Sequence, residues 1–261
     1  MGCTVRTSPS RVSFLRGVYL LGSLILVIVS AGLAASVAYA QPDGALARLK
    51  REDDNIQSTE RLELKAQLSR AADVYSLLAL GSGADVPHEL LERAECIAVL
   101  PGVVKAAFLA GGQHGSGVVS CRDEKLGWTA PAFITMTAGS FGFQIGAQEV
   151  DVVLLMMAKN SRRSIASSKL TLGGDIAVAA GPVGRLAKGE TDLDLSGIYS
   201  FARSRGVFAG VSLEGAVVRP NDRATSTYYG RQLMIEDILF KYAVTILPRE
   251  AGRFISMLPR W

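Results

Sequence analysis

A long run of short, glycine-punctuated segments with period two constrains this fold more than any other feature of the sequence. From Glu95 onward, apolar and small residues alternate and glycines separate the segments, a pattern typical of half-buried strands joined by turns. Helix-length segments do not alternate regularly with them, which argues against a doubly wound parallel sheet. The expected strands are 96–100, 104–111, 115–121, 130–138, 141–147, 150–158, 170–180, 193–203 and 206–218, with a hairpin turn at 111–115 and a polar turn at 122–125.

Helical patterns flank these strands on both sides in the chain. Apolar residues recur at roughly helical spacing between Leu62 and Leu78 and predict a helix from about 59 to 80, before Gly81. Further helices are expected from Pro87, over 161–168, beyond Pro220 and near 249–258. The predicted class is α+β: a mainly antiparallel, Gly-rich β-sheet or barrel flanked by N-terminal and C-terminal helices, in a single domain over 58–261. Residues 41–57 are charged and predict a solvated linker or a weak helix start.

The first forty residues have the pattern of a targeting segment. Three arginines and no acid accompany an apolar run over 17–37, and Ala38-Tyr39-Ala40 is a small-x-small cleavage site. The apolar run is about 20 residues long, which is enough to span a bilayer if it is not cut. We therefore expect export to the periplasm or cell envelope, with residues 1–40 either a cleaved signal peptide or an uncleaved anchor.

The charge balance argues against nucleic acid as a partner, and the remaining cysteines allow a disulfide. Without the three arginines of the leader, the chain has 25 basic and 24 acidic residues, and the formal net charge falls from +4 to +1. A global basic field for nucleic acid is therefore not expected. Cys96 and Cys121 remain after processing, and such a pair tends to bond in an oxidising compartment. The alternative is two buried thiols that only pack.

Local cations suggest an anion-binding surface. Arg203 and Arg205 lie two residues apart on a predicted strand and therefore on one face, and a Gly-rich loop contributes Arg185. The densest cluster, in a segment of eleven residues without an acid, consists of Lys159, Arg162, Arg163 and Lys169. Each cation close to an anionic bilayer is worth ~1 kcal/mol, so four give weak binding unless an apolar group also inserts. The alternative is an ordinary solvated loop and ordinary surface arginines.

The stretch from Ile198 to Gly215 resembles the signature of the SYLF domain family. The resemblance continues upstream in order, through Pro101–Ala106, Gly111–Val119, Trp128–Ala132, Gly139–Gly146, Thr171–Gly174 and Ala179–Gly184, and it ends near Tyr229-Gly230. Roughly half of the chain is covered. It departs at Phe201-Ala202, where the family more often has a polar or basic pair.

This resemblance implies a non-enzymatic module that binds acidic phospholipids, including phosphoinositides, and in some eukaryotic members actin filaments. An exported, bacterial-type member does not meet cytoplasmic actin, which argues against actin as a partner. The expected function is attachment to anionic lipid head groups through the basic surface. One alternative is a structural envelope protein that binds a protein partner through its sheet.

The remaining alternative is a serine hydrolase that uses Ser140. Gly139-Ser140-Phe141-Gly142 lies one letter short of the nucleophile-elbow motif, which needs a strand, a sharp turn and a helix. Phe141 and Phe143 instead continue the alternation of a strand. With only His88 and His114 in the chain, we expect neither a metal site nor a cofactor.

Overall fold

The computed structural model describes residues 42–81, 84–108, 110–125, 127–141, 146–175, 178–180, 197–204, 207–208 and 213–260. The expected leader, together with Arg185 and Arg205, lies outside the described residues. The chain divides into two units, Met1–Asp53 and Asp54–Trp261. The second unit contains the sheet and every site discussed below.

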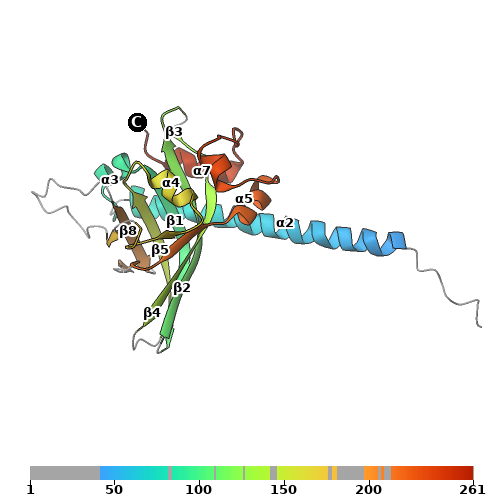
Figure 1. Ribbon diagram of the computed structural model, residues 1–261, viewed down its shortest axis with the longest axis horizontal. Coiled ribbons are helices and arrows are strands. Elements are labelled where there is room, and N and C mark those ends of the chain that lie inside the picture. The colour runs from blue at the N-terminus through green and yellow to red at the C-terminus, as the bar shows by residue number, and fades with distance from the viewer. Residues whose placement is uncertain are drawn as a thin grey trace, which may run out of the picture. The chain divides into compact units, whose positions relative to one another are not determined.

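A mainly antiparallel sheet forms the centre of the second unit (Figure 1). Its strands follow one another in space in the order β6-β10-β4-β2-β1-β5-β8-β7, with β3 paired to β2 and β9 paired to β8. Only β7 and β8 run parallel among the described pairs. The strands are β1 (Cys96–Phe108), β2 (Ala110–Asp123), β3 (Gly127–Trp128), β4 (Ala132–Phe141), β5 (Gly146–Met156), β6 (Leu170–Thr171), β7 (Val178–Ala180), β8 (Ile198–Ser204), β9 (Val207–Phe208) and β10 (Val217–Pro220).

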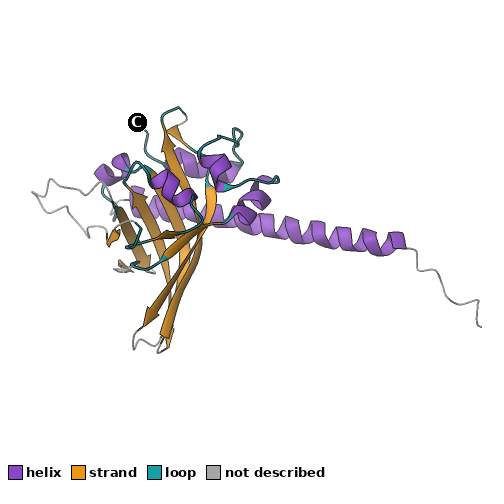
Figure 2. Cartoon of the chain, viewed as in Figure 1, coloured by secondary structure: helices purple, strands orange, loops and turns teal. Residues whose placement is uncertain are grey.

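Helices precede, interrupt and follow the strands along the chain (Figure 2), which confirms the predicted α+β class. They are α2 (Pro42–Tyr75), which continues as a π-helical turn over Ser76–Leu80, α3 (His88–Arg93), α4 (Ser161–Ala166), α5 (Asp222–Tyr229), α6 (Ile235–Leu239) and α7 (Arg249–Met257). The first helix ends at Leu80, as the periodicity predicts, but it begins at Pro42 rather than near residue 59. Residues 42–57 are therefore helical and not a linker. Side chains 46–59 are all exposed, so this part of α2 has no buried apolar stripe for the periodicity to detect.

Each face of the sheet buries its own apolar core, because successive side chains on a strand point to opposite sides. Ala98 and Leu100 of β1 lie in the core that also contains side chains of α4 and α6. Ile97 and Val99 lie in the other core, with side chains of α2, α3, α5 and α7. The sheet thus separates two helical layers, each with its own buried core.

The first hairpin differs from the prediction. The expected strands 96–100 and 104–111 are one strand, with a register shift between Val99 and Val104. The expected turn at 111–115 lies inside β2, and the chain reverses between Phe108 and Ala110. The glycines of β2 serve close packing instead of a turn: a Cβ on Gly117 would lie 2.2 Å from the carbonyl oxygen of Val99.

The chain's own residues also set the ends of α5, the helix that follows β10. The Asn221 side chain accepts a hydrogen bond from the N–H of Ala224, at 3.0 Å, and so caps the first turn. Gly230 ends the helix with φ at 70°, a left-handed conformation that glycine adopts without strain. The Pro220-Asn221-Asp222 break therefore marks the start of the helix that the sequence leads one to expect.

Cys96 and Cys121 occupy paired positions on β1 and β2 and form a disulfide with an S–S distance of 2.03 Å. Both residues are fully buried. The bond joins the first residue of β1 to the end of β2, directly beside Glu95 and Arg122.

Replacing both cysteines with serine is expected to lower the free energy of unfolding by about 3 kcal/mol. The bond closes a loop with a sequence separation of 25 residues, which restricts the unfolded chain. Urea unfolding of the double variant and of the wild-type protein, with and without reductant, measures the difference. Wild-type protein in reductant serves as the control, since it should unfold like the variant. An unchanged transition midpoint in both would contradict the prediction.

Candidate functional site

A pocket of about 660 Å³ lies where the end of β2 meets α4 and the segment after α6. We call it the α4 pocket. Charged side chains dominate its lining, together with Asn160, Phe240 and Tyr242. The cations are Arg122, Lys125, Lys159, Arg162 and Arg163, and the carboxylates are Glu95, Asp123 and Glu124. The lining therefore carries an excess of positive charge, suited to an anion.

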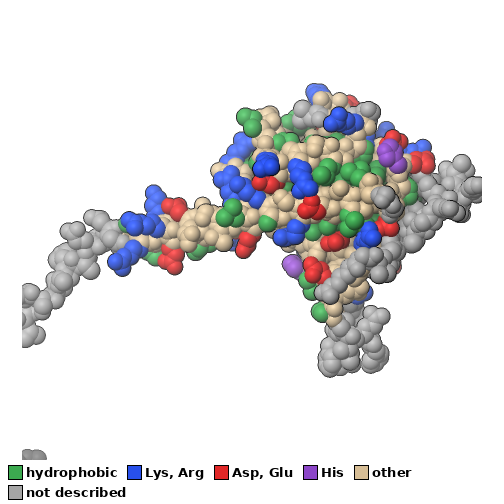
Figure 3. Space-filling view, turned by 180° about the vertical axis from the view of Figure 1, so that it is seen from behind, with side chains coloured by type: hydrophobic (Ala, Val, Ile, Leu, Met, Phe, Trp, Pro, Cys, Tyr) green, Lys and Arg blue, Asp and Glu red, His purple; other side chains and the backbone are tan. Residues whose placement is uncertain are grey.

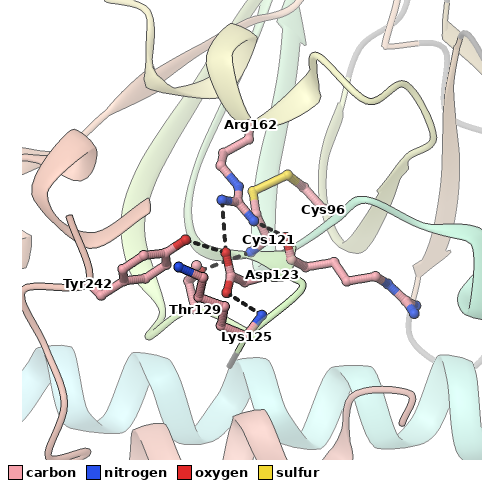
Figure 4. Close-up of polar contacts among 8 residues, drawn as sticks. Cys96, Cys121, Asp123, Lys125, Thr129, Arg162 and Tyr242 are labelled. Atoms are coloured by element: carbon pink, nitrogen blue, oxygen red, sulfur yellow. Dashed lines mark hydrogen bonds and ion pairs between the residues drawn. A yellow bond between two sulfur atoms is a disulfide. The ribbon is translucent and has the colours of Figure 1, made fainter. Parts of the chain in front are cut away.

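Asp123 holds one wall of the pocket together (Figure 4). Its Oδ2 lies 3.2 Å from Nη1 of Arg162 and accepts a hydrogen bond from the hydroxyl of Tyr242. Its Oδ1 accepts the backbone N–H of Lys125, at 2.9 Å. The Asp123 side chain is only 6% exposed, whereas that of Arg162 is 20% exposed. The Asp123 carboxylate thus binds other groups of this chain, and it holds the Arg162 guanidinium in place.

Arg162 makes two further contacts that orient it. Its Nη2 donates a hydrogen bond to the carbonyl of Arg122, and its guanidinium carbon lies 5.9 Å from the ring centroid of Phe240, within cation–π distance. Arg162 is therefore a structural cation of the pocket wall, and reversing its charge would disturb folding as well as binding.

Tyr242 adopts a left-handed backbone conformation, with φ at 51°, alone among the non-glycine residues of the described ranges. Such a conformation is uncommon for a bulky residue, and it persists only where the surroundings enforce it. The hydrogen bond to Asp123 raises the pKa of the Tyr242 hydroxyl, and partial burial and the Asp123 charge act in the same direction. Tyr242 thus anchors the segment after α6 to the end of β2.

Arg122 lines the pocket and also joins elements of the fold. Its Nε and Nη2 donate hydrogen bonds to the carbonyls of Ala94 and Leu91, at 3.0 and 3.3 Å, and its guanidinium lies 5.0 Å from the Trp128 ring centroid. Burial lowers the pKa of Arg122. Its polar atoms secure α3 against β2.

Three cations remain on the outside of the pocket. Lys125, Lys159 and Arg163 are exposed, and none of them forms an ion pair with an acidic side chain among the described residues. They follow β2 or belong to the α4 region, which the fold brings together. These three side chains are the ones a soluble or membrane-bound anion would meet first.

The structure does not assemble all of the predicted basic surface at this pocket. Lys169 is exposed beyond α4 and does not line it. Arg203 pairs with Asp85 at 3.9 Å and lies in register with Asp151 of β5, whereas Met156 of β5 is in register with Cys96 beside the pocket. Asp151 and Met156 are five positions apart on β5, or about 17 Å. Arg203 therefore belongs to another part of the sheet.

Sequence reasoning missed Lys125, Phe240 and Tyr242 as pocket residues. The polar 122–125 segment was expected only as a turn. The expected disulfide could have predicted part of the pocket, because a bond between Cys96 and Cys121 places residues 122–125 beside Glu95. Nothing in the local pattern places the segment after α6 at the same point.

On the face seen in Figure 3, the described cations alternate with other side chains. Figure 3, which views the chain from behind, shows Lys and Arg side chains interspersed with Asp, Glu and hydrophobic side chains. Arg253 and Arg223 pair with Asp73 and Glu60 through contacts of 2.6 and 3.3 Å. Ion pairing thus reduces the free positive charge carried by α5 and α7.

The hydrolase alternative lacks its structural context. Ser140 is in register with Gly111 and lies inside β4, which continues through Phe141, whereas a nucleophile elbow places its serine at the sharp turn between a strand and a helix. His88 lies 3.3 Å from Glu92 on α3.

Within the described ranges, the helices are too short or too polar to cross a membrane.

Comparison with known proteins identifies the domain. A family model described as "Ysc84: Las17-binding protein actin regulator" matches residues 137–260. The chain is 34% identical over 203 residues to "SH3 domain-containing YSC84-like protein 1" of Xenopus laevis, which covers 75% of this chain and 60% of the relative. It is 31% identical over 185 residues to "LAS seventeen-binding protein 3" of Saccharomyces cerevisiae (strain ATCC 204508 / S288c), covering 67% and 40%.

The chain thus spans 40 to 60% of the length of these two relatives. The family description is that of a binding regulator and names no catalytic activity. The resemblance expected from the Ile198–Gly215 stretch is confirmed. The chain contains a domain of the Ysc84/SYLF family.

Proposed function

We propose that this domain is a non-enzymatic module whose α4 pocket binds the phosphate group of an anionic phospholipid at a membrane surface of the cell envelope. The observation that carries the proposal is the group of three exposed cations, Lys125, Lys159 and Arg163, around a pocket of about 660 Å³. Their charges are not neutralised by ion pairs with described acids, whereas Arg162 is held by Asp123. A phosphate entering here meets three exposed cations beside the Arg162 guanidinium, which Asp123 holds in place.

The expected strength of this contact is modest. Three cations near an anionic bilayer contribute about 3 kcal/mol. Because salt screens exposed charges over about 8 Å at physiological ionic strength, the binding should weaken as salt rises. The export expected from residues 1–40 is part of this proposal, since it decides which membrane the domain meets.

A protein partner is the second candidate, favoured by the names of the relatives. One relative is named for binding LAS seventeen, and the family is described as an actin regulator. That description runs against the expectation, drawn from export, that actin is not a partner. Actin and an envelope protein should therefore both be tested by co-purification in high salt, which weakens binding to a charged bilayer but preserves an apolar protein interface.

Replacing Arg163 with glutamate is expected to weaken binding to anionic vesicles roughly 30-fold. The change removes one attraction of ~1 kcal/mol and adds a repulsion of similar size. Co-sedimentation with vesicles of neutral lipid and of lipid containing phosphatidylserine, at low and high salt, measures the effect.

Arg249→Glu is the matched control. Arg249 is an exposed cation at the start of α7, in the helical layer on the other face of the sheet, and the substitution changes the net charge by the same amount. If both variants lose the same affinity, the attraction is a property of the whole surface and the α4 pocket is not the site. If the wild-type protein binds neither vesicle, the lipid proposal is wrong.

A further inference from the structure

Exposed apolar side chains occur before, at the end of and after α6, in the segment that brings Phe240 and Tyr242 to the α4 pocket. Phe240 lines the pocket and is 42% exposed, and Met234, just before α6, is 54% exposed. Ile246, in the segment between α6 and α7, is 88% exposed. Single exposed apolar residues are common on protein surfaces, but these three share one short segment beside a cationic pocket.

The fold keeps this segment compact. Met234 and Phe240 cap the two ends of α6 and are about 9 Å apart along the helix axis. The N–H of Ala243 donates to the carbonyl of Asp237, at 3.0 Å, which folds the chain back onto α6. Ile246 follows three residues later and is therefore within about 11 Å of Ala243.

These exposed side chains are additional to the core and not displaced parts of it. Ile235, Ile238 and Leu239 of α6 are buried in the core on this face of the sheet, and so is Val244. The segment is thus anchored from within, and Met234, Phe240 and Ile246 remain available to a partner.

The neighbouring charges indicate what that partner is. The Arg162 guanidinium lies 5.9 Å from the Phe240 ring centroid, and Lys159 and Arg163 lie on the same pocket rim. The acid Asp237 is paired with Lys241 at 2.9 Å, although Glu236 is exposed. Cations beside exposed apolar groups match an anionic bilayer, whose negative surface covers an apolar interior.

We infer that Met234, Phe240 and Ile246 enter the boundary between head groups and acyl chains when the α4 pocket binds a lipid phosphate. This inference rests on the proposed lipid binding and adds the missing apolar contribution to it. The three cations alone bind weakly. Insertion of apolar side chains next to them converts a salt-sensitive encounter into stable attachment.

Replacing Ile246 with serine is expected to lower the affinity for anionic vesicles roughly tenfold, because one buried aliphatic side chain is lost from the bilayer. The net charge is unchanged, and a side chain this exposed contributes little to folding. Leu77→Ser is the matched control: Leu77 is a half-exposed aliphatic residue in the π-helical turn after α2, whose Leu78 is buried in the core on the other face of the sheet. Its replacement should leave the affinity unchanged.

A direct measurement of insertion uses tryptophan. Ile246→Trp in vesicles that contain brominated anionic lipid should show fluorescence quenching above the wild-type background. Val104→Trp should show none, because Val104 is half exposed on β1 and lies about 25 Å of strand from Cys96 beside the pocket.

The outcomes separate the two proposals. Full wild-type affinity of Ile246→Ser, or equal quenching at positions 246 and 104, overturns the insertion while vesicle binding itself stands. Absence of wild-type binding to anionic vesicles overturns both. A tenfold loss confined to Ile246→Ser, with quenching confined to Ile246→Trp, supports insertion.

Discussion

Replacement of Asp123 with alanine is expected to lower the free energy of unfolding by about 3–5 kcal/mol. The carboxylate is 6% exposed and is bound by Arg162, by the Tyr242 hydroxyl and by the backbone N–H of Lys125. Its removal leaves the Arg162 guanidinium without its counterion and Tyr242 without the bond that offsets a left-handed backbone. Urea unfolding followed by circular dichroism measures the loss.

Two further variants show whether the charge or the hydrogen bonds of Asp123 account for the loss of stability. Asp123→Asn keeps one acceptor oxygen but removes the charge, so a smaller loss of roughly 1–3 kcal/mol is expected. Glu124→Ala removes an exposed carboxylate from the same pocket and should change stability by less than about 0.5 kcal/mol. An Asp123→Ala protein as stable as Glu124→Ala would show that the cluster in Figure 4 does not stabilise the fold.

Asp123 also links stability to binding. It neutralises Arg162, so the Asp123→Asn protein, where it remains folded, presents one more uncompensated cation to an incoming phosphate. Such a protein would be less stable and would bind anionic vesicles more tightly. These opposite changes distinguish a counterion from a residue that binds lipid itself.

The Phe254→Ala substitution is also expected to cost about 3–5 kcal/mol of stability. Phe254 is fully buried on α7, and its ring meets that of Tyr75 edge to face, with centroids 6.2 Å apart. Ala251 of α7 and Leu258, the residue that caps its C-terminal end, are buried in the same core. Removing the ring leaves a cavity in the core between α7 and α2.

The functional readout of this variant separates the two helical layers. Phe254 lies in the core opposite to that of α4 and α6, so vesicle affinity per folded molecule should be unchanged. Arg249→Ala, an exposed substitution on the same helix, controls for changes in helix propensity. A loss of less than about 1 kcal/mol for Phe254→Ala would mean that α7 contributes little to this core.

The spacing of apolar residues and the positions of glycines and prolines were enough to predict most of the helices and several of the strands. Alternation located β1, β2, β4, β5 and β8, the return of helical spacing after Pro220 located the C-terminal helices, and the break at Gly81 matched the end of the first helical segment at Leu80. The expected strand 170–180 was wrong: β6 pairs with β10, a turn follows at 173–175, and β7 pairs with β8. These signals are local: each depends on residues two to four apart. For the same reason the exposed part of α2 from Pro42 was missed, since a helix without a buried face leaves no apolar period.

The candidate site needed the tertiary structure. Arg162 and Arg163 are adjacent in sequence, yet one is bound to Asp123 in the pocket wall and the other is exposed. Phe240 and Tyr242 come to the same pocket from about eighty residues further along the chain. Arg203 looked equivalent to these cations in sequence but pairs with Asp85 elsewhere on the sheet.

The sequence by itself therefore determined the class of fold, the order of its main elements and the family. The tertiary structure decided which charges are free, which are neutralised and which apolar side chains border them. The physical reason is that periodicity specifies only the face on which a residue lies. Register and long-range pairing specify its neighbours, and a charge binds an external partner only where its neighbours leave it uncompensated.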